Sequence, residues 1–143
     1  MIGLEDIMTK DIVAVHKDAD IYDAIRMMVD GNITGVPVVD DKGYLEGVIT
    51  EKDALKCLRT GEGADTKVSD YMTAEVVGFD VRDSLTDIVQ VLEEANFRRV
   101  PILSKGKVVG IISRRDVLSF LFMLELEERG THTTAVGGKF PAQ

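Results

Sequence analysis

The sequence consists of one pattern of about sixty residues that occurs twice. Displaced by 64 positions, the chain matches itself at Met8-Thr9 and Met72-Thr73, and again at Val36-Pro37 and Val100-Pro101. After one extra residue near positions 41–43, the displacement becomes 63, and the matched pairs are Gly47 and Gly110, Ile49 and Ile112, Asp53 and Asp116, and Leu55 and Leu118. Loops tolerate insertions, so a one-residue change at a turn fits a duplicated fold. The chain is therefore predicted to fold as two similar units.

Each unit is predicted to have the order β-α-β-β-α. In the first copy, residues 12–15 and 36–39 are short runs typical of strands, and residues 45–49 complete a hairpin after the turn at 40–43. Pro37 suits a strand start or edge. Asp20 can cap a helix that Gly31-Asn32 ends, and a second helix is expected from Thr50 to Thr60. Apolar residues recur at helical spacing in the first of these helices, at Ile21, Ala24, Ile25, Met28 and Val29.

The second copy repeats this order, with a strand at residues 75–79, a helix on Leu85, Ile88, Val89 and Leu92, a hairpin at residues 100–112 and a helix from Ser113. One unit of about 60 residues buries too little surface to be comfortably stable alone. We therefore expect an α/β (α+β) body in which two repeats pack through their sheets with pseudo-two-fold symmetry. The predicted boundaries are repeat 1 at residues 1–60, a linker at 61–67, repeat 2 at 68–126 and a flexible tail at 127–143.

Composition narrows the functional classes. The net charge of −8 disfavours binding to nucleic acid or anionic membranes through the whole surface. Cys57 is the only cysteine, so we interpret it as a small apolar residue and expect a reducing compartment. The chain has neither an apolar run of membrane-spanning length nor a basic, apolar start, which predicts a cytoplasmic protein. Since metal-ligand spacings and catalytic motifs are lacking, we expect neither a metal nor an enzyme.

Two short polar motifs fall where a predicted strand meets a helix. They are Thr50-x-x-Asp53 and, one repeat later, Ser113-x-x-Asp116. One interpretation is a capping box, in which the hydroxyl and the carboxylate satisfy backbone amides at the helix start. The other is a ligand site, because a helix N-terminus attracts phosphate and an aspartate can accept hydrogen bonds from ribose hydroxyls. Spacing alone leaves both interpretations open.

The charge is unevenly distributed. Residues 98–115 contain six basic side chains and no acidic one. Lys105 and Lys107 flank the predicted turn and are expected to be solvated. Arg98 and Arg99 instead precede a buried strand, and their counterparts in the first copy, Thr34 and Gly35, are uncharged. Anion binding by the two arginines is the favoured hypothesis, and nucleic-acid binding by the whole basic segment is a minor alternative.

The order of these motifs resembles a tandem pair of cystathionine-β-synthase (CBS) domains, or Bateman module. The resemblance covers about residues 7–124 and rests on the Met-Thr and Val-Pro pairs, Gly47-Val48-Ile49-Thr50-Glu51-Lys52-Asp53 and Gly110-Ile111-Ile112-Ser113-Arg114-Arg115-Asp116. It implies a regulatory, non-catalytic module that binds adenosine-containing ligands (AMP, ADP, ATP or S-adenosylmethionine) between the copies. It further implies that ligand occupancy is relayed to a partner protein.

The resemblance also implies that each cleft takes residues from both copies. Cleft 1 would consist of Thr50, Asp53, Thr73, Val77, Phe97, Arg98 and Arg99. Cleft 2 would consist of Ser113, Asp116, Thr9, Val13, Ile33, Thr34 and Gly35. Two arginines would neutralise phosphate in cleft 1, while the matching strand brings none to cleft 2. Cleft 1 is therefore expected to bind the more highly charged nucleotide, and cleft 2 to be weaker, empty or specific for a less charged adenosyl ligand.

The last helix is apolar on more than one face, which is typical of a helix buried on several sides. Its apolar positions are Val117, Leu118, Phe120, Leu121, Phe122, Met123, Leu124 and Leu126. In the CBS family two such pairs often assemble head-to-head or head-to-tail into a disc of four repeats, so the resemblance implies a homodimer. The alternative function is a structural dimerisation module whose clefts stay empty.

Overall fold

The computed structural model describes residues 2–61, 65–94 and 98–129. The first repeat contains η1 (Leu4–Asp6), β1 (Val15–His16), α1 (Ile21–Gly31), β2 (Gly35–Val39), β3 (Leu45–Thr50) and α2 (Glu51–Thr60). The second contains α3 (Val68–Tyr71), β4 (Phe79–Asp80), α4 (Leu85–Leu92), β5 (Arg99–Ser104), β6 (Lys107–Ser113) and α5 (Arg114–Arg129). The predicted order and fold class are confirmed.

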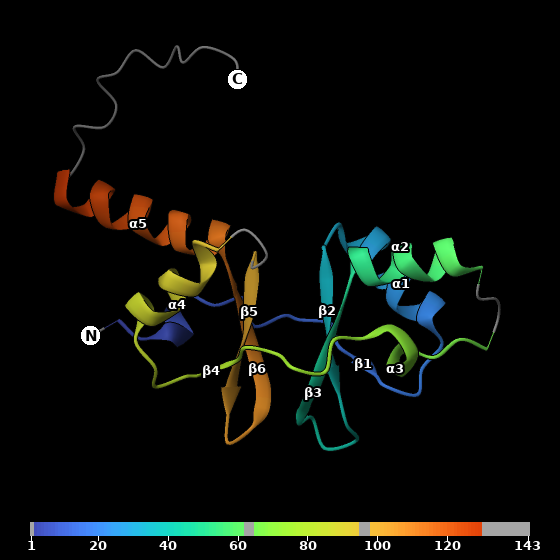
Figure 1. The fold of residues 1–143 in the computed structure, drawn as a ribbon. Coiled ribbons are helices and arrows are strands. Elements are labelled where there is room, and N and C mark those ends of the chain that lie inside the picture. Colours follow the sequence, from blue (N-terminus) through green and yellow to red (C-terminus); the bar gives the residue numbers. More distant parts are fainter. Residues whose placement is uncertain (1, 62–64, 95–97, 130–143) are drawn as a thin grey trace, which may run out of the picture.

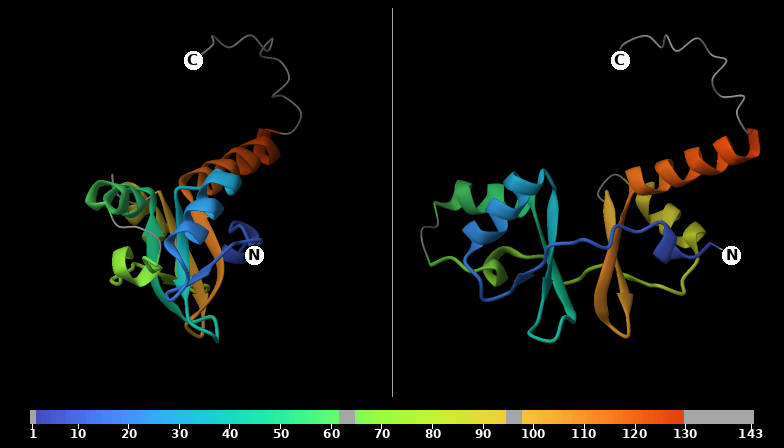
Figure 2. Two further views of the ribbon diagram at one scale, coloured as in Figure 1. Left: turned by 90° about the vertical axis from the view of Figure 1, so that its right-hand side faces the viewer. Right: turned by 180° about the vertical axis from the view of Figure 1, so that it is seen from behind.

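The elements form four layers, with two sheets facing each other at the centre and helices on both outer sides (Figure 1). Each sheet has three strands, in the order β1-β2-β3 or β4-β5-β6. The first pair in each sheet is parallel and the second is an antiparallel hairpin. Figure 2 shows from the side and from behind that the two hairpins run down the middle of the molecule.

The first strand of each repeat is shorter than predicted and lies later in the chain. β1 covers Val15–His16 instead of residues 12–15, and β4 covers Phe79–Asp80 instead of residues 75–79. Both strands exist only where they pair with the central strand, at Val15 with Val38 in the first sheet. The expectation that Pro37 lies at a strand start or edge is wrong, because Pro37 is in the middle of β2, the central strand, immediately before its pairing with β1 begins. The missing amide hydrogen of Pro37 therefore costs no ladder bond to β1.

The predicted helix caps are present, but one apolar position is wrong. Asp20 accepts a hydrogen bond from the Tyr22 amide at 2.9 Å, and Asn32 ends α1 in the left-handed conformation. Ile21 is fully buried, whereas Val29 is 72% exposed. Helical periodicity predicts a wide apolar stripe, and only its central part faces the sheet.

Each hydrophobic core includes the leading segment of the other repeat. Val68 of α3, an element that was not predicted, is fully buried in the core of β1–β3, while Leu4 of η1 is buried in the core of β5, β6 and α4. In Figure 1 η1 accordingly lies beside α4, and α3 lies beside α1 and α2. The chain therefore crosses between the two halves twice, and neither core is complete without residues from the other repeat's leading segment.

Residues 7–14 and 72–78, the two crossing segments in which the chain passes from one half to the other, explain the repeated Met-Thr and Gly motifs. Thr9 exchanges two backbone hydrogen bonds with Ile111 of β6, and Thr73 does the same with Val48 of β3. A side chain at Gly47 would meet the Thr73 carbonyl oxygen at 2.6 Å. Glycine is therefore required at position 47, where the Thr73 backbone passes over β3, whereas at Gly110 a side chain would meet only the flexible side chain of Met8.

The two hairpin turns also bind each other at the lower end of the molecule in Figure 1. The Leu45 amide donates to the Gly106 carbonyl at 3.3 Å, and the Val108 amide donates to the Gly43 carbonyl at 3.1 Å. The Lys107 ammonium lies 5.6 Å from the centre of the Tyr44 ring. The two sheets are thus joined at the hairpin turns.

Candidate functional site

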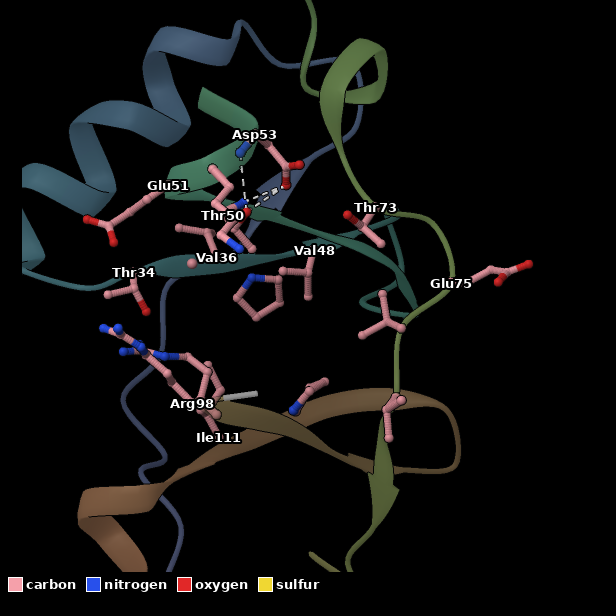
Figure 3. Close-up of a pocket in the computed structure, with 17 residues that line it drawn as sticks. Thr34, Val36, Val48, Thr50, Glu51, Asp53, Thr73, Glu75, Arg98 and Ile111 are labelled. Carbon is pink, nitrogen blue, oxygen red and sulfur yellow. Dashed lines mark hydrogen bonds between the residues drawn. The ribbon is translucent and has the colours of Figure 1, made fainter. Parts of the chain in front are cut away.

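A cleft of about 580 Å³ lies between the two repeats, and we call it cleft 1 (Figure 3). Its first wall is the junction of β3 with α2, which carries Thr50 and Asp53. Its second wall is the start of β5, with Arg98 and Arg99, and its third is the crossing segment around Thr73. The cleft therefore joins a helix N-terminus of one repeat to the basic segment of the other.

The Thr50 and Asp53 motif forms a complete capping box in cleft 1. The Thr50 amide and hydroxyl both donate to Asp53 Oδ2, each at 2.9 Å, and Thr50 Oγ1 accepts from the Asp53 amide at 3.3 Å. The capping interpretation is thus confirmed. Among the described residues, Asp53 Oδ1 has no hydrogen-bond partner, so the cap leaves this oxygen available to a ligand.

Most of the residues expected in cleft 1 lie there. Thr50, Asp53, Thr73, Val77, Arg98 and Arg99 all line it, whereas Phe97 lies outside the described residues. The cleft has further lining residues that sequence analysis did not assign to it: Thr34, Gly35, Val36, Pro37, Val48, Glu51, Lys52, Glu75, Val76, Pro101 and Ile111. Glu51 and Lys52 could have been inferred, because they occupy the first turn after Thr50. Glu75 carried no such signal.

A second cleft of about 590 Å³, cleft 2, lies on the other side of the same interface. Of the expected residues, Ser113, Asp116, Thr9, Val13, Ile33 and Gly35 line it, whereas Thr34 lies in cleft 1. Its additional lining residues are Asp11, Ile12, Arg26, Met27, Asp30, Gly31, Arg99 and Ile111. The repeat pattern thus places similar elements around both clefts.

Cleft 2 contains a bond between the repeats for which the described part of cleft 1 has no equivalent. Ser113 and Asp116 cap α5, since the Ser113 amide donates to Asp116 Oδ2 at 2.8 Å and Ser113 Oγ accepts from the Asp116 amide at 3.1 Å. Thr9 Oγ1 also donates to Asp116 Oδ1 at 3.3 Å. The oxygen that is available on Asp53 is therefore already engaged on Asp116.

The two clefts differ less in basic residues than their strands alone suggest. Cleft 2 receives Arg26 from α1 and Arg99 from β5, although its own strand start supplies Thr34 and Gly35. Burial lowers the pKa of the Arg99 guanidinium from its usual value, and Asp116 and Glu51 act in the opposite direction. Arg99 stays protonated, because the ordinary pKa of this group is far above neutrality.

Nowhere in residues 2–61, 65–94 and 98–129 do three or more His, Cys, Asp or Glu side chains gather as a metal site requires. None of the helices in these segments is both long and apolar enough to cross a membrane.

The chain is similar to part of a longer protein and to two CBS domain pairs of known structure. MJ1225 from Methanocaldococcus jannaschii is 30% identical over 118 residues, which make up 82% of this chain and 42% of that protein. CBSX2 from Arabidopsis thaliana, solved in complex with AMP, is 28% identical, with a TM-score of 0.75 over 86% of this chain and 98% of that one. The CBS domain pair of MJ0100, solved with 5′-methylthioadenosine and S-adenosyl-L-methionine, is 27% identical, with a TM-score of 0.72 over 85% of this chain and 99% of that one.

One similar protein is an enzyme, and this chain matches only a small part of it. The chain is 30% identical to inosine-5′-monophosphate dehydrogenase from M. jannaschii and spans 22% of that protein's length. The CBS domain family model matches residues 4–60 and 68–122, so it covers both repeats and more than half of the chain. The chain belongs to the CBS domain family and carries two copies of the domain.

Proposed function

We propose that this protein is a regulatory module that binds adenosine-containing nucleotides in the clefts between its two CBS repeats. The observation that carries the proposal is the meeting of Thr50 and Asp53 with Arg98 and Arg99 across cleft 1. This arrangement combines hydroxyl and carboxylate groups, which suit a ribose, with two cations, which suit a phosphate. The cleft volumes of about 580 and 590 Å³ fall in the usual range for small-molecule sites, about 300–1,000 Å³.

Each part of an adenosine nucleotide has a suitable partner in cleft 1. Asp53 Oδ1 would accept from the ribose hydroxyls, and the guanidinium groups of Arg98 and Arg99 would bind the phosphate. The adenine ring would lie on the apolar part of the wall, which includes Val77, Pro101 and Ile111. AMP in CBSX2, and 5′-methylthioadenosine and S-adenosyl-L-methionine in MJ0100, support this class of ligand for the present chain.

Thermal stabilisation tests the proposal directly. A ligand at 100 times its dissociation constant adds about 2.7 kcal/mol to the free energy of unfolding. We expect AMP, ADP, ATP or S-adenosylmethionine to raise the melting temperature, and Asp53→Ala to reduce the increase. Because Asp53 also caps α2, the matched control is Ser84→Ala, which removes the α4 cap outside the lining of either cleft. If none of the four ligands at millimolar concentration shifts the melting temperature, the proposal fails.

We further propose that ligand occupancy changes the separation of the two sheets and that a partner protein detects this change. The hairpin turns are bonded to each other by Leu45 and Gly106, and by Val108 and Gly43, so movement would be greatest at the opposite end. A ligand shifts such an equilibrium only through different affinities for the two arrangements. In this proposal the chain itself has a binding role and no catalytic one.

A homodimer is supported by exposed apolar side chains on the outer helices. Leu55 and Leu58 of α2 are 64% and 77% exposed, and Leu118 and Phe122 of α5 are 65% and 63% exposed. On each helix these side chains are three or four positions apart and so share one face, and contiguous exposed apolar patches mark protein interaction surfaces. We expect sedimentation to give a dimer at micromolar concentration, and a monomer would contradict this part of the proposal. If nucleotides do not bind but the dimer forms, the alternative of a dimerisation module is favoured.

A further inference from the structure

Arg99 lies between the two clefts and lines both of them. It is the first residue of β5, and its counterpart in the first repeat is Gly35, the first residue of β2. Gly35 also lines both clefts, but it has no side chain. The two equivalent positions between the clefts therefore carry one guanidinium group instead of two.

The Arg99 side chain has unused hydrogen-bonding capacity. Its Nε atom is buried and has no hydrogen-bond partner among the described residues. The two carboxylates that favour its charged form belong to different clefts, since Glu51 lines cleft 1 and Asp116 lines cleft 2. Neither carboxylate is near enough to form an ion pair with it. A buried donor without a partner is costly, so an anion that offers an oxygen to Arg99 gains binding energy.

We propose that Arg99 is shared between the two clefts, so that an anionic ligand in one cleft weakens the binding of an anionic ligand in the other. This inference rests on the proposed nucleotide function and adds a coupling between its two sites. A guanidinium has its five donors in one plane and in fixed directions, so a phosphate that binds it from one cleft takes donors that are then not available to a phosphate in the other. The first phosphate to bind also cancels the charge that would attract the second.

The coupling depends on ligand charge, which gives it a specific signature. Two AMP molecules compete for Arg99, whereas two molecules of uncharged adenosine do not. Typical coupling free energies between sites correspond to about 5- to 150-fold changes in affinity. We therefore expect AMP in one cleft to weaken AMP binding in the other at least about fivefold, and adenosine to show no such effect.

The test needs variants in which only one cleft can be filled. Val77 lines cleft 1 alone and Val13 lines cleft 2 alone, at equivalent positions of the two repeats. They are 40% and 45% exposed, so a larger side chain can enter the cleft without disturbing a core. Val77→Trp thus blocks cleft 1, and Val13→Trp blocks cleft 2, in the 143-residue chain.

Calorimetric titration with AMP then measures the coupling. Each single-cleft variant gives the dissociation constant of the remaining cleft while the other holds no phosphate. In the wild-type chain we expect the second AMP to bind at least about fivefold more weakly than the same cleft does alone. Arg99→Gln should abolish this difference. The control is Arg82→Gln, which removes an exposed arginine outside the lining of both clefts and should leave the difference unchanged.

A second measurement on chains that retain Arg99 does not depend on the stability of Arg99→Gln. The Nε–H resonance of Arg99 should move when AMP binds to Val77→Trp and also when AMP binds to Val13→Trp. Movement in one variant only overturns the sharing of Arg99. Two AMP molecules that bind the wild-type chain independently also overturn the coupling, while the nucleotide proposal stands. If AMP binds to none of the chains, the coupling between AMP sites is overturned, and the melting test with all four ligands separately decides the nucleotide proposal.

Discussion

Clefts 1 and 2 come from the same repeated pattern, yet their polar groups are arranged differently. In cleft 1, the Asp53 cap leaves Oδ1 available, and Arg98 and Arg99 lie opposite. In cleft 2, Asp116 forms the same cap but is also bonded to Thr9 across the repeats. A ligand that uses the aspartate enters cleft 1 without breaking a hydrogen bond, whereas in cleft 2 it must replace Thr9. Both repeats thus keep the helix cap, while the placement of the facing threonine, the same residue type in both, decides what each cap offers to a ligand.

The largest expected difference in stability between matched variants of the two repeats concerns Gly47 and Gly110, over which the crossing segments pass. A Cβ at Gly47 meets the backbone oxygen of Thr73 at 2.6 Å, whereas a Cβ at Gly110 meets the flexible side chain of Met8 at 2.5 Å. A backbone atom cannot move aside as a methionine can. We expect Gly47→Ala to cost about 3 kcal/mol and Gly110→Ala about 1 kcal/mol of unfolding free energy. Denaturant unfolding measures both, and equal losses would contradict this distinction.

The next largest expected difference in stability is between variants at Arg114 of the second repeat and at its counterpart Glu51 in the first. Glu51 lines cleft 1. Arg114 instead donates from Nε to the Leu92 carbonyl at 2.8 Å and from Nη2 to the Glu94 carbonyl at 2.6 Å, at the end of α4. Hydrogen bonds from a charged donor contribute about 1.5–3 kcal/mol, so Arg114→Ala should destabilise the fold by about 2 kcal/mol.

The matched change in the first repeat is Glu51→Ala. Glu51 is exposed, and in the described residues its side chain makes no hydrogen bond or ion pair. Its substitution should change the unfolding free energy by less than about 0.5 kcal/mol. Comparable losses in the two chemical-denaturation curves would show that Arg114 has no special structural role.

Nucleotide charge should distinguish the clefts less strongly. Cleft 1 contains Lys52, Arg98 and Arg99, and cleft 2 contains Arg26 and Arg99, with three carboxylates in each. We expect Asp53→Ala to lower the affinity for ATP about tenfold and Asp116→Ala less than about threefold, because cleft 1 has the additional cation and the available carboxylate oxygen. Calorimetric titration with ATP and AMP gives both ratios. Equal losses from the two substitutions would refute the assignment of the more charged nucleotide to cleft 1.

The smallest difference is the bond that joins the repeats across cleft 2. Thr9→Val removes the 3.3 Å hydrogen bond to Asp116 and should lower the unfolding free energy by about 0.5 kcal/mol, since the bond is exposed and long. Thr73→Val is the matched change in cleft 1, where no such bond to Asp53 is formed, and should have no measurable effect on stability. Thermal unfolding of the two variants in parallel tests this. A larger loss from Thr73→Val would reverse the comparison.

Local features of the sequence were enough to predict the β-α-β-β-α elements of each repeat, but not η1 and α3. The helix caps at Asp20 and Thr50 depend on residues two or three positions away, and both are present in the structure. The hairpin turns likewise depend on short runs of turn residues. The extent of β1 was wrong, because residues 12–14 are apolar but have no partner beside β2. Strand length was decided by pairing, which the run itself does not contain.

The sequence by itself determined that there are two equivalent halves, each with a capped helix after a hairpin, because repetition and caps are written in neighbouring residues. Only the tertiary structure decided that Leu4 packs with the second repeat and Val68 with the first. It also placed Arg99 in both clefts and Arg26 in cleft 2. These placements depend on how the two sheets approach each other and on how the crossing segments complete the opposite core. Contacts between residues so far apart in the chain leave no local pattern from which to predict them.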